Sequence, residues 1–166
     1  TTYYPLHTTY SFRIEGYDIS NISGTSSVGS TVVFSARGGS ALGGEILGPD
    51  KNEYRKFKIR TIQGANDIGM LKEVLTRRFK NDWRMPNLIL IDGGLPQVNS
   101  AREVLNDLNL NIPIIGIAKG PERKRNDIIG IISEDITEKT LIQVRDEAHR
   151  FAIKFHKELR AKNIFQ

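Results

Sequence analysis

Apolar residues along the chain follow two kinds of pattern, one typical of strands and one typical of helices. Residues 88–91 (LILI) and 112–118 (IPIIGIA) are continuously apolar, as is typical of strands that are buried on both faces. Residues 12–20, 30–34 and 54–61 are rich in aromatic and β-branched residues or alternate in polarity, and they predict three more strands. The pattern therefore predicts about five main strands.

A helical rhythm appears between and after the apolar strands. Apolar residues recur at spacings of three and four between Asn66 or Asp67, which caps the segment, and about Lys80, and they predict a helix there. Two more helices are expected at about 97–108 and 146–162, and a small hairpin is expected from 128–132 and 140–144. Strands followed by alternating helices and strands predict an α/β fold, a mixed sheet flanked by helices.

The remaining segments are predicted to connect these elements within one domain, residues 1–166. Residues 1–11 are interpreted as a leader and residues 21–29 as a turn-rich bridge. Residues 35–50 hold five glycines in sixteen positions, which favours an extended flap or insertion because glycine makes ordering costly.

Composition excludes several classes of site. The chain has 166 residues, 39% hydrophobic and 26% charged, which is ordinary for a globular domain. It has no cysteine, so disulfides, cysteine–zinc sites and thiolate catalysis are excluded. Its apolar runs are far shorter than the ~18 residues of a membrane span. The chain begins with Thr rather than Met, and we expect it to be a monomeric domain of a larger cytoplasmic protein.

Positive charge is concentrated in the middle of the chain. The net charge is +5, and residues 51–100 carry 10 Lys or Arg against 5 Asp or Glu. This excess indicates either a face for a polyanion such as nucleic acid or a generic solubilising surface. The cations come from three separate segments, and those expected to contact phosphate are Lys56, Lys58, Arg77, Arg78, Lys119, Arg123 and Lys124.

Two aspartates occupy positions that favour chemistry. Asp18 lies inside the first predicted strand, and Asp92 ends the LILI run, where ligands of α/β sheets usually bind. On neighbouring parallel strands the two carboxylates would repel each other unless a cation lay between them, and a hard ion such as Mg²⁺ or Mn²⁺ suits oxygen donors. The alternatives are a hydrogen-bonded buried Asp18 and an Asp92 that merely begins a turn.

His149 is the third candidate. On a helix it shares one face with Ala152, Ile153 and His156, so we expect it to point toward the core or a cleft. An imidazole can bind a metal or move a proton near neutral pH, although a buried core histidine is the commoner outcome. His156 lies roughly 10 Å further along the helix, too far to serve the same site directly.

Several sequence blocks together resemble a known family. These blocks are RIEGYDISNISGTSSVGSTVVF, EYRKFKIRT, MLKEVLTRRF, NLILIDGG, IPIIGIAKGPERK and VRDEAHRFAI. In this order they resemble the C-terminal endonuclease domain of UvrC, the incision subunit of bacterial nucleotide excision repair. The resemblance implies an RNase H-like fold and incision of the damaged strand 5′ of a lesion. It also implies a divalent metal held by an Asp–Asp–His set, which falls on Asp18, Asp92 and His149.

Some features depart from the family pattern. The family often has an acidic Asp-Asp-Tyr segment before the MLKEVLTRRF-like helix, so Asp67 is either an accessory acid or, as we favour, a helix cap. The 35–50 insertion is longer than expected. The family's GIY-YIG nuclease, UvrB-binding segment and helix–hairpin–helix pair are missing, so we expect little activity without them.

The resemblance and the residues together predict a metal-dependent DNA endonuclease. We expect Asp18 and Asp92 to hold one Mg²⁺ or Mn²⁺ ion, with His149 as a further ligand or as an acid–base group. The implied partners are damaged DNA and, through the intact protein, UvrB loaded on DNA by UvrA. Two alternatives remain, a catalytically silent nucleic-acid-binding domain of the same fold and a module whose basic face docks an acidic protein.

Overall fold

One mixed sheet organises the part of the chain that the structure describes. The computed structural model describes residues 12–22, 26–36, 47–120, 125–134 and 136–164. The strands are β1 (Arg13–Ile22), β2 (Ser26–Ala36), β3 (Leu47–Pro49), β4 (Arg55–Lys58), β5 (Leu88–Asp92), β6 (Ile114–Lys119) and β7 (Asn126–Ile129). Their order is β3-β2-β1-β5-β6-β7, with β4 also paired to β2. β1, β5 and β6 run parallel, whereas β2, β3, β4 and β7 join their neighbours antiparallel.

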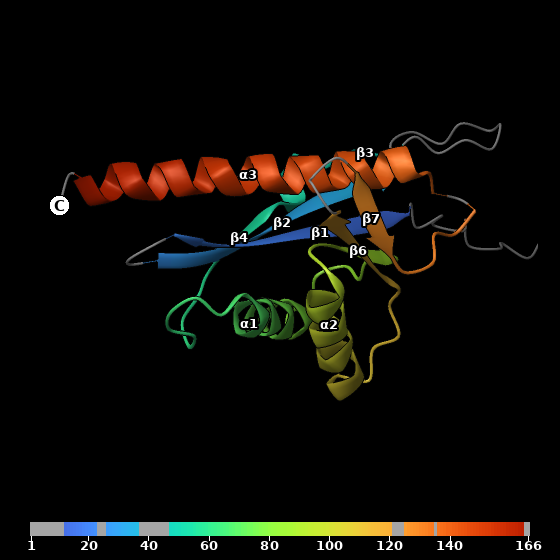
Figure 1. The fold of residues 1–166 in the computed structure, drawn as a ribbon, viewed down its shortest axis with the longest axis horizontal. Helices are drawn as coiled ribbons and strands as arrows, with labels where there is room; N and C mark the ends of the chain where they lie inside the picture. The colour runs from blue at the N-terminus through green and yellow to red at the C-terminus, as the bar shows by residue number, and fades with distance from the viewer. Residues whose placement is uncertain (1–11, 23–25, 37–46, 121–124, 135, 165–166) are drawn as a thin grey trace, which may run out of the picture.

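Three helices cover the two faces of this sheet. α3 (Glu138–Ile164) lies along one face, while α1 (Asp67–Phe79) and α2 (Leu95–Asp107) lie on the other (Figure 1). Each face has its own apolar cluster. Leu88 and Leu90 of β5 pack on the α3 side, and Ile89 and Ile91 pack on the side of α1 and α2. The continuous apolar run of β5 is therefore explained by burial on both faces.

Two glycines let the helices approach the sheet closely. A Cβ at Gly16 would lie 2.6 Å from Cγ1 of Val144 on α3, and a Cβ at Gly29 would lie 2.6 Å from Cγ2 of Val74 on α1. Real side chains do not tolerate contacts this short. Gly16 precedes Asp18 by two residues on the same face of β1, so this close packing also sets how near α3 comes to that aspartate.

Most predicted elements are confirmed, with small shifts at their ends. The helix expected from residue 66 or 67 to about 80 is α1, and Asn66 caps it by accepting a hydrogen bond from the Gly69 amide at 2.9 Å. The mixed α/β sheet is also confirmed. The expected leader, residues 1–11, lies outside the described residues, and the one-domain organisation stays a prediction. None of the described helices offers a stretch long and apolar enough to span a membrane.

Two of the sequence predictions are wrong. Residues 140–144, expected as the second strand of a small hairpin, belong to α3, which begins at Glu138. β7 pairs with β6 instead of with residues 140–144. The reason is that Leu141, Val144 and Ala148 are buried at helical spacing against the sheet. The bridge expected at 21–29 is shorter, because β1 continues to Ile22 and β2 begins at Ser26.

The expected flap, residues 35–50, is described only at its two ends. Ser35 and Ala36 still belong to β2, and Leu47–Pro49 forms β3 against that strand, with Phe34 opposite Pro49. Residues 37–46 lie outside the described residues.

Candidate metal centre

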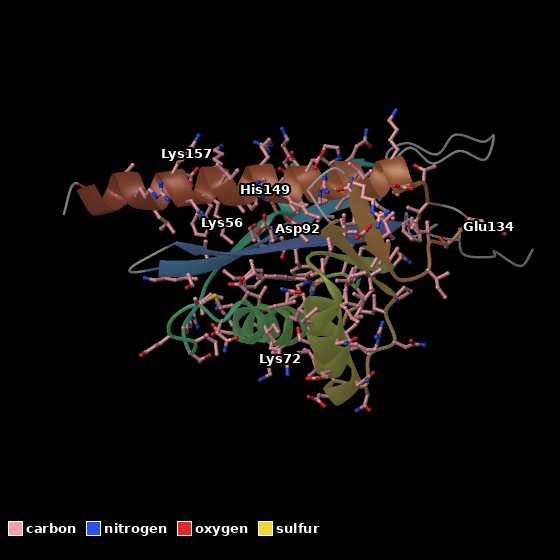
Figure 2. The ribbon with its side chains drawn as sticks, viewed as in Figure 1. Lys56, Lys72, Asp92, Glu134, His149 and Lys157 are labelled. Atoms are coloured by element: carbon pink, nitrogen blue, oxygen red, sulfur yellow. The ribbon has the colours of Figure 1, made fainter. Side chains whose placement is uncertain are left out.

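The strand register places the two candidate aspartates side by side. In the parallel pair of β1 and β5, Tyr17 lies opposite Ile91, so the next residues, Asp18 and Asp92, are also neighbours. Asp92 is the last residue of β5, and Asp18 points to the face that α3 covers. Figure 2 shows His149 beside Asp92 between α3 and the sheet. Residues separated by 74 and then 57 positions in the chain thus converge, as the sequence predicts.

The three side chains form a compact donor set. Nδ1 of His149 lies 3.1 Å from Oδ2 of Asp18 and 3.9 Å from Oδ2 of Asp92. One potential ligand atom from each residue lies within 4.8 Å of the other two. The side chains of Asp18 and Asp92 are 8% and 23% exposed, whereas that of His149 is 56% exposed. The carboxylates therefore form the floor of the site and the imidazole its open edge.

Burial raises the pKa of both carboxylates. Burial, followed by the negative charge of Asp92, raises the pKa of Asp18 to about 6, although the hydrogen bond and charge of His149 oppose this rise. Burial also raises the pKa of Asp92, against the charges of His149, Arg145 and Lys119. Burial thus disfavours the ionised form of both carboxylates in spite of the positive charges nearby, and a further cation between them would restore that form.

This donor set fits a hard divalent cation. Mg²⁺ and Mn²⁺ prefer carboxylate oxygens and tolerate an imidazole, and an ion between Asp18 and Asp92 would relieve their repulsion. Ser30 lies directly opposite Asp18 on β2, and within the described residues its buried hydroxyl has no hydrogen-bond partner. A buried polar atom without a partner is uncommon, and here it borders the candidate metal site.

Two cations border the aspartates, and only one of them was expected. Lys119, at the end of β6, is exposed and close enough for its charge to lower the pKa of Asp92. Arg145 acts on Asp92 in the same way and also donates a hydrogen bond to Asn126. Arg145 was not expected from the sequence, yet it lies four residues before His149, the spacing that places two side chains on the same helix face.

Asp67 is not the helix cap that we favoured. Asn66 provides the cap, and Asp67 is the first residue of α1 and is exposed. Its negative charge reaches Asp18 and contributes to the raised pKa of that residue. Asp67 therefore lies in the electrostatic neighbourhood of the metal centre, although it is outside the set of three ligand atoms.

Arg78 was expected to contact DNA, and this expectation is wrong. Its side chain is 1% exposed and forms an ion pair with Glu15, from the guanidinium NH2 group to Oε1, at 2.7 Å. A guanidinium buried under the sheet cannot reach a phosphate in solvent. Residues 15 and 78 are 63 positions apart, and nothing in the local sequence indicates this pairing.

The other expected phosphate contacts lie at the surface, and two of them have partners within the chain. Lys56 pairs with Glu158 at 2.7 Å. Arg77 donates hydrogen bonds to Glu73 and to the backbone carbonyl of Lys58. The side chain of Lys58 is exposed. Arg123 and Lys124 lie outside the described residues.

Comparison with protein families gives a match over most of the chain. Residues 6–153 match the family model described as the UvrC RNAse H endonuclease domain. UvrABC system protein C of Caldicellulosiruptor saccharolyticus is 43% identical over 163 residues, covering 93% of this chain and 26% of the relative. The protein of that name from Finegoldia magna is 44% identical over 168 residues, covering 91% and 26%. The chain thus spans about a quarter of the length of these curated relatives.

Two solved structures have a similar chain course at low sequence identity. Ciona intestinalis endonuclease V in complex with an inosine-containing DNA has a TM-score of 0.44 and 17% identity, covering 94% of this chain and 58% of that one. Thermus thermophilus RuvC has a TM-score of 0.39 and 11% identity, covering 65% and 62%.

Proposed function

The chain belongs to the UvrC RNase H endonuclease domain family, and from this premise we propose that it is a divalent-metal-dependent nuclease that makes the 5′ incision in nucleotide excision repair. Membership confirms the RNase H-like fold class expected from the sequence. The observation that carries the proposal is the cluster of Asp18, Asp92 and His149. Two carboxylates crowded by burial and an imidazole at their edge are the groups that such a reaction requires.

In this proposal Asp18 and Asp92 hold one Mg²⁺ or Mn²⁺ ion. A bound divalent ion supplies Lewis-acid stabilisation of the charge that develops as the phosphodiester is attacked. The two aspartates fix its position because strand backbones and α3 leave their side chains little freedom. Asp67 is an accessory acid whose charge adds to the negative potential that attracts the cation.

We assign His149 the transfer of a proton. Its side chain is the most exposed of the three, so it is accessible to water and substrate, and its Nδ1 faces Asp18. A carboxylate beside one ring nitrogen orients an imidazole for proton transfer at the other nitrogen. His149→Ala should therefore reduce turnover while leaving divalent-metal binding largely intact, whereas Asp18→Asn should remove both.

Basic side chains at the surface would position the DNA backbone. The charge of Lys119 reaches Asp92, and the other proposed phosphate contacts are Lys56, Lys58, Arg77, Arg123 and Lys124. Contacts of this kind fix the register of a strand and carry no sequence information. They suit an enzyme that partner proteins direct to damage.

The wider setting of this activity is also proposed. As part of a longer cytoplasmic protein the domain would act as a monomer on damaged DNA, together with UvrB that UvrA has loaded at the lesion. The relatives' name, UvrABC system protein C, supports this setting.

A chimera tests the proposal in its proposed context. In the Finegoldia magna protein the matching quarter is replaced by this chain, and a lesion-bearing duplex is incised with UvrA and UvrB of that organism in Mg²⁺ or Mn²⁺. We expect a 5′ incision that Asp18→Asn lowers by at least about 100-fold, as when a group that stabilises a transition state is removed. Asp107→Asn, at the exposed end of α2, is the matched control.

Three outcomes would overturn the proposal. If Asp18→Asn incised at the wild-type rate, the assigned site would be wrong. If the wild-type chimera bound DNA and made the 3′ cut but no 5′ cut, the chain would be the catalytically silent DNA-binding domain instead. Loss of DNA binding altogether would favour the protein-docking alternative.

A further inference from the structure

We propose that one flank of α3 binds an unpaired DNA strand that leads away from the metal centre. The flank consists of His149, Ile153, His156 and Arg160, and we refer to it as the α3 track. This inference rests on the proposed nuclease function, because it extends the same site. It names the substrate form, a strand whose bases are not paired where it meets the enzyme.

Helical spacing places the four residues on one side of α3. They follow each other at intervals of four, three and four residues, so their side chains lie along a single stripe. His149, Ile153 and Arg160 are exposed, and His156 is half-buried. The exposed Ile153 corrects the expectation that this whole face turns inward, which holds only for Ala152, next to it on the helix.

The opposite flank of α3 packs against the sheet side of the molecule. Glu147 accepts a hydrogen bond from the Tyr54 hydroxyl at 3.0 Å, and the Phe155 ring lies 4.8 Å from Nζ of Lys56. Glu158 completes this packing through its ion pair with Lys56. The aromatic and acidic flank thus holds α3 against β4 and its neighbours, whereas His149, Ile153 and Arg160 of the α3 track are exposed to solvent.

The α3 track is continuous with the metal centre. His149 belongs to both, and the charges of His149 and Arg160 both reach His156 and contribute to lowering its pKa, after burial. His156 lies about 10 Å beyond His149 along the helix axis. In Figure 1 the C-terminal part of α3 extends past the ends of β1 and β2. A strand that enters the site could therefore continue along the helix.

The side chains of the α3 track suit an unpaired strand better than a duplex. Arg160 can bind a phosphate, and Lys119, whose charge reaches Asp92, provides a second cation near the aspartates. Ile153, whose side chain is unusually exposed for an isoleucine, and the imidazole of His156 offer apolar and aromatic contact. Base faces are available for such contacts only where the strand is unpaired and unstacked.

Charge argues for nucleic acid over a protein partner. None of the four positions of the α3 track is acidic, and Arg160 carries a permanent positive charge. Lys154 and Lys157 are also exposed cations of α3, but no aromatic or aliphatic side chain lies between them in the same stripe. They therefore provide a control for unspecific attraction of a polyanion.

The first test compares two cations three residues apart. Binding of the chain to a fluorescein-labelled 20-residue oligo(dT) is measured by anisotropy in EDTA, so that neither cleavage nor metal enters. Arg160→Ala should raise Kd about 5- to 10-fold and reduce the salt slope by about 0.7, whereas Lys157→Ala should change Kd less than about 2-fold. Equal effects of the two variants would overturn the α3 track, because both remove one positive charge.

The second test separates the unpaired strand from the duplex. Ile153→Ser and His156→Ala should each weaken binding to oligo(dT) several-fold more than binding to a duplex of equal length. Thermal unfolding of each variant checks that the fold is intact, and Ile153 is exposed enough for the serine to be tolerated. Equal losses on both probes, or no loss on either, would contradict the inference, and the latter result would favour a protein partner for this flank.

The two proposals fail in different ways. The nuclease proposal is judged by the 5′ incision and its dependence on Asp18, and the α3 track is judged by metal-free binding of uncut DNA. Incision that depends on Asp18, together with equal effects of Arg160→Ala and Lys157→Ala, would remove the α3 track alone.

Discussion

Strand β1 carries two buried carboxylates that face opposite sides of the sheet and have opposite surroundings. Glu15, with a fully buried side chain, accepts hydrogen bonds from Arg78, Arg13 and Tyr17 at 2.7–3.2 Å. Burial, with the carboxylate of Glu15 beside it, raises the pKa of Tyr17 well above its usual value, so its hydroxyl remains a donor. Glu15 is thus fully compensated by groups of the chain itself.

Asp18, three residues later, is nearly as buried but faces a second carboxylate. The hydrogen bond that the structure gives its side chain is to His149, and burial with the charge of Asp92 raises its pKa to about 6. The contrast distinguishes two uses of a buried acid. A carboxylate whose cations are built into the fold stabilises that fold, whereas one that lacks them is prepared to bind a cation from solution.

The largest effect is expected where the compensated acid is disturbed. Glu15→Gln leaves the guanidinium groups of Arg13 and Arg78 buried without a full counter-charge. Breaking a buried ion pair in this way costs about 3–5 kcal/mol, so the free energy of unfolding measured by urea titration should fall by that amount. A change below about 1 kcal/mol would show that the network around Glu15 contributes little.

Neutralising Asp18, which has no such set of cations around it, should raise the free energy of unfolding instead of lowering it. Asp18→Asn removes a charge that is both desolvated and repelled by Asp92, so the metal-free chain should become more stable at pH 7. The raised pKa of about 6 sets an upper limit of about 3 kcal/mol for this gain. Urea titration in EDTA measures it, and a variant less stable than wild type would contradict the proposed strain between Asp18 and Asp92.

A pH series sharpens the comparison further. Because the folded pKa of Asp18 lies above its ordinary value of 3.8, the folded chain holds this proton more tightly than the unfolded chain. The contribution to stability is present below about pH 4 and is lost as pH rises through about 6. The free energy of unfolding of Asp18→Asn should therefore exceed that of the wild type by an amount that grows between pH 4 and 6. A difference that does not depend on pH would show that titration of Asp18 is not its cause.

The sequence predicts the metal centre better than its surroundings, for a physical reason. Asp18 and Asp92 sit on strands whose apolar pattern fixes both the strand type and the edge where a ligand binds, and helical spacing orients His149. Arg78 was misassigned because its basic neighbour Arg77 and its position in the last turn of α1 both favour a solvent-exposed cation. Its true partner, Glu15, is 63 residues away and occupies a strand position that the local pattern does not distinguish from an ordinary polar one.

The errors in the fold have the same origin. Residues 140–144 have a locally strand-like composition, and only packing of Leu141 and Val144 against the sheet decides for a helix. Arg145 was missed because its relation to Asp92 depends on the start of that helix. Local pattern thus determines the residues that lie on regular elements, whereas pairings across the core require the folded chain.

Calorimetric titration of the chain with Mn²⁺ at pH 7.5 is the most direct test of the proposed metal site at Asp18 and Asp92. One ion per chain should bind to the wild type, and binding should be lost in Asp18→Asn. Binding should persist in Glu15→Gln when the titration is made without urea, where that variant is still folded. Equal binding by the wild type and Asp18→Asn, or no binding by the folded wild type, would contradict the account.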